Sequence, residues 1–148
     1  MAKILIVEDN ALNIKLFCDL LAAHGHEPNA VTDSRLALDA ARQFSPDLVI
    51  TDIQLPHVSG LELIRMLRKD DELSEVPIMA VTAYSTSEDE ERIRAAGAQA
   101  YVSKPISVVR FAETVEQLLN QKDEPAIDDS ANDVSDGPGP GETGGEES

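Results

Sequence analysis

Short apolar runs alternate with amphipathic stretches along residues 1–121 of the chain. Such alternation is typical of a parallel sheet wrapped by helices. Four apolar runs predict strands over residues 4–7, 48–51, 78–81 and 100–103, and a fifth strand is predicted over Glu27–Val31. The pattern therefore predicts one α/β domain in which a doubly wound, five-stranded parallel sheet carries five helices.

The stretches between these runs carry apolar residues at helical spacing. In the second predicted helix, Leu36, Ala40 and Phe44 recur every four residues, with Ala37 and Ala41 beside them. One face of the fifth predicted helix carries Val108, Phe111, Ala112, Val115, Leu118 and Leu119. Each of these helices can therefore bury one stripe against the sheet.

Capping signals mark several helix ends. Ser59 and Ser87 each precede a glutamate by three residues, the spacing of a capping box, and they predict the starts of the third and fourth helices. Gly25 and Gly97 stand where a helix C-terminus favours a left-handed residue. The fourth helix has Ile93 as its single large apolar anchor, so we expect this helix to be locally unstable and easily moved.

The first predicted helix has more apolar positions than one buried face requires. They are Leu12, Ile14, Leu16, Phe17, Leu20 and Leu21. Part of this surplus is expected to be exposed, and exposed apolar surface next to a site often docks a partner. Ordinary packing in the core is the alternative.

A proline constrains the order of the strands. Pro28 falls inside the predicted second strand, and proline is confined to sheet edges because it cannot donate to a ladder. An edge position for the second strand agrees with the strand order 2-1-3-4-5. In that order the first and third strands lie side by side at the switch point.

Composition narrows the class of function. The chain has 148 residues, one cysteine and a net charge of −16. One core is expected at this length, an internal disulfide is excluded, and unaided nucleic-acid binding is disfavoured because phosphates would be repelled. No run is long enough to span a membrane and no signal peptide is visible, so a cytoplasmic location is expected.

Residues 122–148 differ in composition from the rest of the chain. Nine acidic side chains and one basic side chain there carry half of the net charge of −16. Residues 136–148 include no large apolar side chain, and such a segment cannot offset the entropy of its own ordering. We predict a folded domain over residues 1–121 and a disordered acidic tail over 122–148, which aids solubility or docks a partner.

Chemically active side chains follow the ends of four predicted strands. Glu8 and Asp9 follow the first strand, Asp52 the third, Thr82 the fourth and Lys104 the fifth. Groups just past the carboxyl ends of parallel strands meet in one crevice of an open sheet. The sequence therefore predicts a pocket that holds three carboxylates, a hydroxyl and an ammonium group.

This set of groups predicts a magnesium site. Carboxylates at close range repel one another unless a proton or a cation intervenes, and oxygen ligands favour a hard divalent ion. Mg²⁺ keeps several waters and takes one or two protein carboxylates. We expect Asp9 and Asp52 as direct ligands, Glu8 as the acceptor for a metal-bound water, and the Gln54 backbone carbonyl as a further ligand.

Asp52 is the predicted nucleophile of the pocket. A carboxylate can attack phosphorus and carry the phosphoryl group as a mixed anhydride. Such a transfer depends on alignment and on neutralising the charge of the equatorial oxygens. Besides Mg²⁺, Lys104 can reach these oxygens as a point charge, and Thr82 offers a hydroxyl donor.

Each of these positions has an ordinary explanation when it is taken alone. An acidic pair after a strand often caps a helix, and an aspartate at a strand end is often a turn residue. A lysine before proline is usually a surface residue. Their coincidence at the ends of separate strands of one domain favours the functional interpretation.

The motifs at these positions resemble the receiver domain of two-component response regulators. They are VEDN at residues 7–10, DIQLP at 52–56 with SG at 59–60, VTA at 81–83, and KP at 104–105. The resemblance covers residues 1–121 and implies a flavodoxin/CheY-like (βα)5 fold with strand order 2-1-3-4-5. It also implies a phosphoacceptor signalling protein rather than an enzyme.

The resemblance assigns a role to each pocket residue. Asp52 would accept a phosphoryl group from the phosphohistidine of a histidine kinase or of a histidine phosphotransfer protein. Glu8 and Asp9 would bind Mg²⁺, and Lys104 would contact the phosphate.

Further residues would read out the phosphate. Thr82 and Ala83 would contact it, and Thr82 would form a switch pair with Tyr101, whose ring turns inward. The peptide bond between Lys104 and Pro105 is typically cis in this family. The face formed by the fourth helix, the fifth strand and the fifth helix would then change its arrangement.

The expected output is contact with a downstream protein effector or kinase, or onward phosphotransfer. The residues after 121 are too few and too charged to form an effector domain. Longer stretches of the chain resemble single-domain regulators that act in cell division or polarity.

Three other functions use parts of the same pattern. A haloacid-dehalogenase-like phosphatase has its nucleophile after the first strand and a second aspartate two residues on, where this chain has Gln54 after Asp52. A flavin carrier of this fold needs a phosphate-binding loop after the first strand, where Glu8 and Asp9 would repel the ligand. A pseudo-receiver that only binds partners would have an incomplete pocket, and here every element of the pocket is present.

Overall fold

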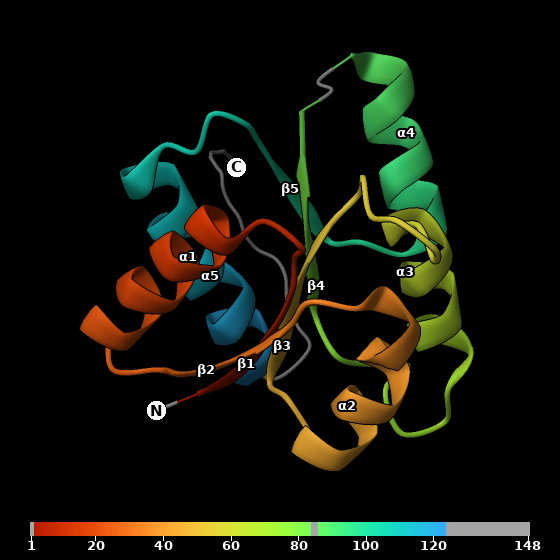
Figure 1. The fold of residues 1–148 in the computed structure, drawn as a ribbon, viewed down its shortest axis with the longest axis horizontal. Helices are drawn as coiled ribbons and strands as arrows, with labels where there is room; N and C mark the ends of the chain where they lie inside the picture. The colour runs from red at the N-terminus through yellow and green to blue at the C-terminus, as the bar shows by residue number, and fades with distance from the viewer. Residues whose placement is uncertain (1, 84–85, 124–148) are drawn as a thin grey trace, which may run out of the picture.

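The structure, a computed structural model, describes residues 2–83 and 86–123. Within these residues, five strands alternate with five α-helices, and a short 3-10 helix, η1 (Ser34–Leu36), precedes the second of them (Figure 1). The strands are β1 (Lys3–Val7), β2 (Glu27–Val31), β3 (Leu48–Asp52), β4 (Ile78–Thr82) and β5 (Ala100–Ser103). The helices are α1 (Ala11–Ala23), α2 (Ala37–Phe44), α3 (Gly60–Lys69), α4 (Ser87–Ala96) and α5 (Val108–Asp123).

The sheet is parallel throughout, and its order is β2-β1-β3-β4-β5. This confirms the predicted doubly wound fold. Helices α1 and α5 cover one face of the sheet, and α2, α3 and α4 cover the other (Figure 1). In the register of the central strands, Val7 lies opposite Thr51, so the segments that follow β1 and β3 emerge side by side.

Strand β2 is an edge strand, as Pro28 predicts. The Glu27 N–H donates to the Ala2 carbonyl at 2.8 Å, and the Val31 carbonyl accepts from the Glu8 N–H at 3.1 Å. Because alternate residues of a strand face the same neighbour, the nitrogen of Pro28 faces the open edge. The proline therefore removes no hydrogen bond from the β1–β2 ladder.

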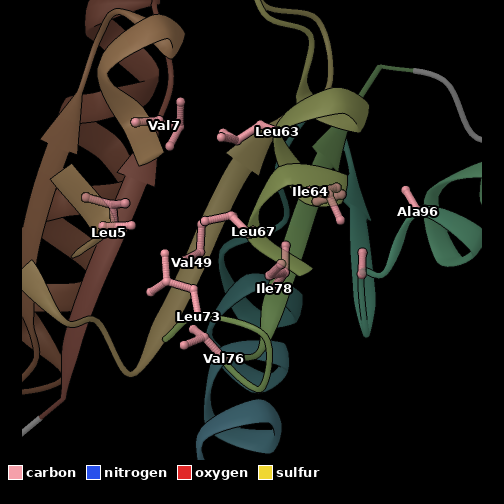
Figure 2. Packing of buried hydrophobic residues seen from close by; sticks show 14 of the residues in the cluster. Leu5, Val7, Val49, Leu63, Ile64, Leu67, Leu73, Val76, Ile78 and Ala96 are labelled. Carbon is pink, nitrogen blue, oxygen red and sulfur yellow. The ribbon is translucent and has the colours of Figure 1, made fainter. Parts of the chain in front are cut away.

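Each face of the sheet packs a separate apolar cluster. Under α2, α3 and α4 the strands contribute Leu5, Val7, Val49, Ile78 and Ala80. Figure 2 shows part of this cluster, in which Leu63, Ile64 and Leu67 of α3 gather over the strands. Under α1 and α5 lie the alternate strand residues, and Phe17 stacks on Phe111 there with ring centroids 5.0 Å apart. Buried apolar area on both faces is the main source of stability of such a sheet.

Two apolar residues of the predicted stripes are exposed. Leu36 is 59% exposed, because it belongs to η1, and α2 instead buries the small side chains of Ala37 and Ala41. Val108 is also exposed, because it is the first residue of α5 and precedes the turn in which Phe111 packs. Small residues in α2 let that helix approach the sheet closely.

The caps agree with the sequence at α3 and differ at α4. The Ser59 hydroxyl accepts from the Glu62 N–H at 3.2 Å, and the Glu62 carboxylate accepts from the Ser59 N–H at 3.4 Å. Helix α4 begins one residue earlier than a Ser87 cap would place it, because the Thr86 hydroxyl accepts from the Asp89 N–H at 3.1 Å. The expected Ser87–Glu90 capping box is therefore wrong. Thr86 and Asp89 hold that end instead.

The expected C-terminal glycines and the thin anchoring of α4 are confirmed, and the local instability of α4 remains a prediction. Gly25 and Gly97 follow α1 and α4 with φ of 84° and 127°. Ile93 and Ala96 are the buried residues of α4, so this helix is as thinly anchored as its sequence predicts. Helix α5 extends through Asp123, two residues into the predicted tail, and the rest of that tail (124–148) lies outside the described residues. None of the helices in the described part of the chain is both long and apolar enough to cross a membrane.

Candidate functional site

The acidic residues predicted to share a pocket lie together at the carboxyl ends of β1 and β3. Asp52 is the last residue of β3, and Glu8 and Asp9 follow β1. One carboxylate oxygen from each of the three lies within 4.8 Å of the others. Glu8 and Asp52 are buried and Asp9 is exposed, so the cluster has one side open to solvent.

Lys104 supplies the positive charge of the pocket. It follows β5, and its backbone N–H donates to the Thr82 carbonyl at 2.8 Å. Its Nζ donates to Asp52 Oδ2 at 2.9 Å and lies 3.9 Å from Glu8 Oε1. The peptide bond between Lys104 and Pro105 is cis. The lysine side chain thus reaches past the end of β4 to the acidic cluster.

Backbone amides of the flanking loops orient both buried carboxylates. The Asn10 N–H donates to Glu8 Oε2 at 3.1 Å, and Asn10 itself caps α1 by accepting from the Asn13 N–H at 3.0 Å. The Gln54 N–H donates to Asp52 Oδ1 at 3.2 Å. Each acid is therefore held by the first residues after its own strand.

Glu8 is the member of the cluster whose buried carboxylate is least well compensated. Among the described residues, its Oε1 is the buried side-chain oxygen that accepts no hydrogen bond. Burial, and then the neighbouring charge of Asp52, raise the pKa of Glu8 above its ordinary value. A divalent cation would satisfy this oxygen and offset the repulsion, so the oxygen donors present here fit Mg²⁺.

Glu8→Gln is expected to stabilise the metal-free protein, and increasingly so as the pH rises above 4.5, the ordinary pKa of glutamate. A carboxyl whose pKa is raised by folding contributes stability below its unfolded pKa and loses that contribution as the pH rises through its folded pKa. Glutamine does not titrate and can still accept from the Asn10 N–H. Each unit of elevation is worth about 1.4 kcal/mol.

Thermal unfolding in EDTA between about pH 4 and pH 8 measures this difference. Glu113→Gln, at an exposed position of α5, is the matched control and should show no pH-dependent gain. A gap between Glu8→Gln and the wild type that does not widen with pH would refute the expectation.

Gly60 closes the loop that carries Asp52. Its N–H donates to the Ile53 carbonyl at 2.9 Å, which brings the start of α3 against the end of β3. A Cβ at this position would lie 2.1 Å from the Asp52 carbonyl oxygen and 2.6 Å from the Ile53 Cα. Only glycine permits this approach, so the position of Asp52 depends on it.

The residues expected to read out a phosphate lie on β4, directly after it, and on β5. Thr82 is buried at the end of β4 and Ala83 is exposed next to it. Tyr101 is half-buried on the face of the sheet covered by α3 and α4. Its hydroxyl donates to Glu90 Oε1 at 3.2 Å, so the ring is tied to α4.

Glu90 is a site residue that sequence reasoning missed. Its other carboxylate oxygen accepts from Arg94 Nε at 3.1 Å, and the Arg94 guanidinium carbon lies 5.8 Å from the centroid of the Tyr101 ring. The spacing of Glu90 and Arg94 does indicate an ion pair on one helix. The contact with Tyr101 depends on how α4 packs, which no local pattern reveals.

Comparison with known proteins agrees with this geometry. The sequence profile of the response regulator receiver domain matches residues 4–116. The polar-differentiation response regulator DivK of Brucella anthropi is 54% identical over 116 residues, which are 78% of this chain and 94% of that protein. DivK of Brucella ovis is 53% identical over the same length, with the same coverage.

Solved structures show the same fold. Chemotaxis protein CheY4 of Vibrio cholerae matches with a TM-score of 0.76 and 26% identity, over 80% of this chain and 98% of that one. The receiver domain of a sensor histidine kinase from Pseudomonas aeruginosa, described with magnesium in its active-site cleft, matches with a TM-score of 0.74 and 28% identity, over 80% and 98% of the two chains. This chain belongs to the response regulator receiver family of two-component systems, and it resembles DivK.

Proposed function

We propose that this chain is a stand-alone response regulator that accepts a phosphoryl group on Asp52 from a phosphohistidine when Mg²⁺ is present. The observation that supports the proposal is the setting of Asp52, whose carboxylate is buried, bonded to Lys104 at 2.9 Å and clustered with Glu8 and Asp9. The donor is a histidine kinase or a histidine phosphotransfer protein. The pocket of the P. aeruginosa receiver, which holds magnesium, supports the choice of ion.

The pocket residues divide the chemistry of the transfer between them. An Asp52 carboxylate oxygen forms the new bond to phosphorus while the phosphorus–nitrogen bond of the donor breaks, and the imidazole leaves with the electron pair. Lys104 offsets negative charge on the transferred group. Asp9, Asp52 and the Gln54 carbonyl would hold Mg²⁺, with Glu8 on a bound water, and the ion would neutralise charge on the equatorial oxygens. The protein therefore both accepts the phosphoryl group and supplies side chains that assist the transfer.

Exposed apolar side chains on the helices that follow the pocket residues provide a surface for the donor protein. Leu12 is 79% exposed in the first turn of α1, which follows Asp9 closely in the chain. Val109 is 66% exposed in the first turn of α5, a few residues after Lys104. Part of the apolar surplus of α1 thus faces solvent, as its sequence predicts. These residues follow Asp9 and Lys104 closely in the chain, and their exposed apolar surface favours docking of a protein.

The biological setting follows from the relatives. DivK of Brucella is named for polar differentiation, and the same role in polarity or cell division is proposed for this chain in the cytoplasm. Its output is a downstream protein effector or kinase, reached by contact rather than by direct binding to nucleic acid.

Phosphotransfer from purified histidine kinases of the source organism tests the proposal. We expect at least one kinase to label the chain within seconds in Mg²⁺ and to leave it unlabelled in EDTA. Absence of labelling by every kinase and by small phosphoryl donors would refute it and would leave a pseudo-receiver that only binds partners.

Mg²⁺ is expected to raise the melting temperature of the protein. A ligand that binds only the native state adds RT ln(1 + [L]/Kd), roughly 1.4 kcal/mol at ten times Kd. Thermal melts with and without millimolar MgCl₂ measure the shift. A double variant, Glu8→Gln with Asp9→Asn, should lose it. Identical midpoints for the wild type in the two buffers, or an undiminished shift in the double variant, would contradict a metal role for the cluster.

Phosphorylation is proposed to release Tyr101 from α4. The phosphate adds about −1.5 to −2 charge to an acidic pocket, so its oxygens require donors such as Lys104 and the Thr82 hydroxyl. Movement of Thr82 makes room that the Tyr101 ring can fill, at the cost of the bond to Glu90. Helix α4 can follow because few of its residues are buried. The face of α4, β5 and α5 then has two arrangements that phosphate biases.

Thr82→Ala is expected to accept phosphate at a nearly normal rate and to lose most of the phosphate-dependent gain in partner affinity. Glu90→Gln is the matched opposite, since it weakens the hydrogen bond that ties Tyr101 to α4 and should raise partner affinity before phosphorylation. Binding of an effector to phosphorylated and unphosphorylated protein measures both. Full phosphate dependence in Thr82→Ala and in Tyr101→Ala together would show that the signal leaves by another face.

A further inference from the structure

The end of β2 and the segment that follows it contact both loops that carry the acidic residues of the pocket, the loop after β1 and the loop after β3. The last residue of β2, Val31, accepts from the Glu8 N–H at 3.1 Å. Three residues later comes Ser34, a serine that is only 2% exposed and begins η1. A buried hydroxyl requires partners, and the partners of this one lie in the loop after Asp52.

The Ser34 hydroxyl bridges two backbone groups of that loop. Its Oγ donates to the Pro56 carbonyl at 2.8 Å and accepts from the Val58 N–H at 3.1 Å. Between these groups lies His57, whose φ of 70° is uncommon for a residue other than glycine. Both bonds therefore bracket the turn at His57 and help to hold it in this conformation, together with the packing of Leu55 and Val58 against the apolar cluster.

The loop joins this turn directly to the pocket. It is closed at its base by the bond from the Gly60 N–H to the Ile53 carbonyl, at 2.9 Å. Gln54 lies between that base and the turn, and its N–H donates to Asp52 Oδ1 at 3.2 Å. The turn at His57 lies between the Gln54 peptide and the end of the loop at Gly60, so a change in the turn can shift that peptide.

We infer that Ser34 is a positioning residue for the cation site, because its hydroxyl fixes the turn at residues 56–58 and thereby the Gln54 peptide. That peptide orients Asp52 through its N–H and carries the carbonyl proposed as a metal ligand. The inference rests on the proposed function, since it concerns the same Mg²⁺ site. Ser34 itself contacts neither the ion nor the phosphoryl group.

Calorimetric titration with MgCl₂ tests the inference without any phosphoryl transfer. Ser34→Ala is expected to bind Mg²⁺ about tenfold more weakly, at the low end of the effect of groups that orient metal ligands. Ser34→Thr keeps the hydroxyl and should restore most of the affinity. The matched control is Ser59→Ala, which removes a different hydroxyl of the same loop. Among the described residues, the Ser59 hydroxyl accepts from the Glu62 N–H at the start of α3. The control variant should lower the melting temperature and leave Mg²⁺ affinity within about twofold, because its cap lies outside the ligand segment.

Hydrogen exchange on the wild-type protein gives a second readout that needs no variant. If the turn and the cation site are coupled, Mg²⁺ must slow exchange of the Val58 amide, whose hydrogen bond goes to Ser34. Unchanged Val58 exchange would overturn the inference, and so would equal Mg²⁺ affinities in Ser34→Ala and the wild type, or equal losses in Ser34→Ala and Ser59→Ala. A wild-type protein that binds no Mg²⁺ would overturn the proposed metal site and this inference together.

Discussion

Asp52→Asn is expected to accept no phosphoryl group from any donor. The amide oxygen is not a nucleophile at neutral pH, so the bond to phosphorus cannot form. The variant should still fold, because the single side-chain oxygen of asparagine can keep one of the two hydrogen bonds that Asp52 accepts, from the Gln54 N–H at Oδ1 and from Lys104 Nζ at Oδ2. Intact mass spectrometry after incubation with a phosphorylated histidine kinase and Mg²⁺ measures the loss, and circular dichroism checks the fold.

Asp9→Asn is the control that separates the nucleophile from the ligand. It keeps the Asp52 carboxylate and removes the exposed acid of the cluster. We expect phosphorylation of this variant to slow and to recover as the Mg²⁺ concentration rises, because only ion affinity is impaired. Label that persists in Asp52→Asn would place the acceptor at another residue and would invalidate the assignment of Asp52.

Gly60→Ala is expected to cost about 3 kcal/mol or more of folding free energy, the upper end of the range for overpacking. Its Cβ would lie 2.1 Å from the Asp52 carbonyl oxygen. The obstructing atoms belong to the backbone at the end of a fully buried central strand, so no side chain can rotate away. Either the bond from Gly60 to Ile53 breaks or the end of β3 shifts, and the shift would also misplace the nucleophile.

Chemical denaturation of both variants distinguishes this clash from a general effect of replacing glycine. Gly25→Ala is the control, because Gly25 has φ of 84° and no atom within 4 Å of a built Cβ. Only the left-handed conformation opposes alanine there, at a cost of about 1 kcal/mol. A loss in Gly60→Ala no larger than that in Gly25→Ala would show that the loop after Asp52 yields easily.

The position of a strand or of a side chain in the fold was predictable where the chemistry of the residue allowed only one location in the sheet. Pro28 could not lie in a central strand, and the edge position it requires agrees with the observed strand order. The acids after β1 and β3 had to meet because parallel strands end at one edge of the sheet. The cluster of Glu8, Asp9 and Asp52 therefore follows from the strand order, which local sequence patterns predict.

Details that depend on packing between elements were not predictable. Leu36 matches a helical stripe but lies exposed in η1, because the sheet accommodates small alanines more closely. Thr86 and Ser87 are equivalent as caps by residue type, and the fold decides between them. The partner of Tyr101 depends on where α4 lies against β5, and local spacing does not encode that contact.

The outward-facing nitrogen of Pro28 also affects how molecules of this protein meet. An edge strand normally offers a row of amide donors to which the strand of another chain can add. In β2 that row is interrupted at its second residue, where the outward position has no N–H. The opposite edge, β5, is only four residues long. Both edges of the sheet are therefore poor templates for strand addition, which protects the protein from edge-to-edge aggregation at high concentration.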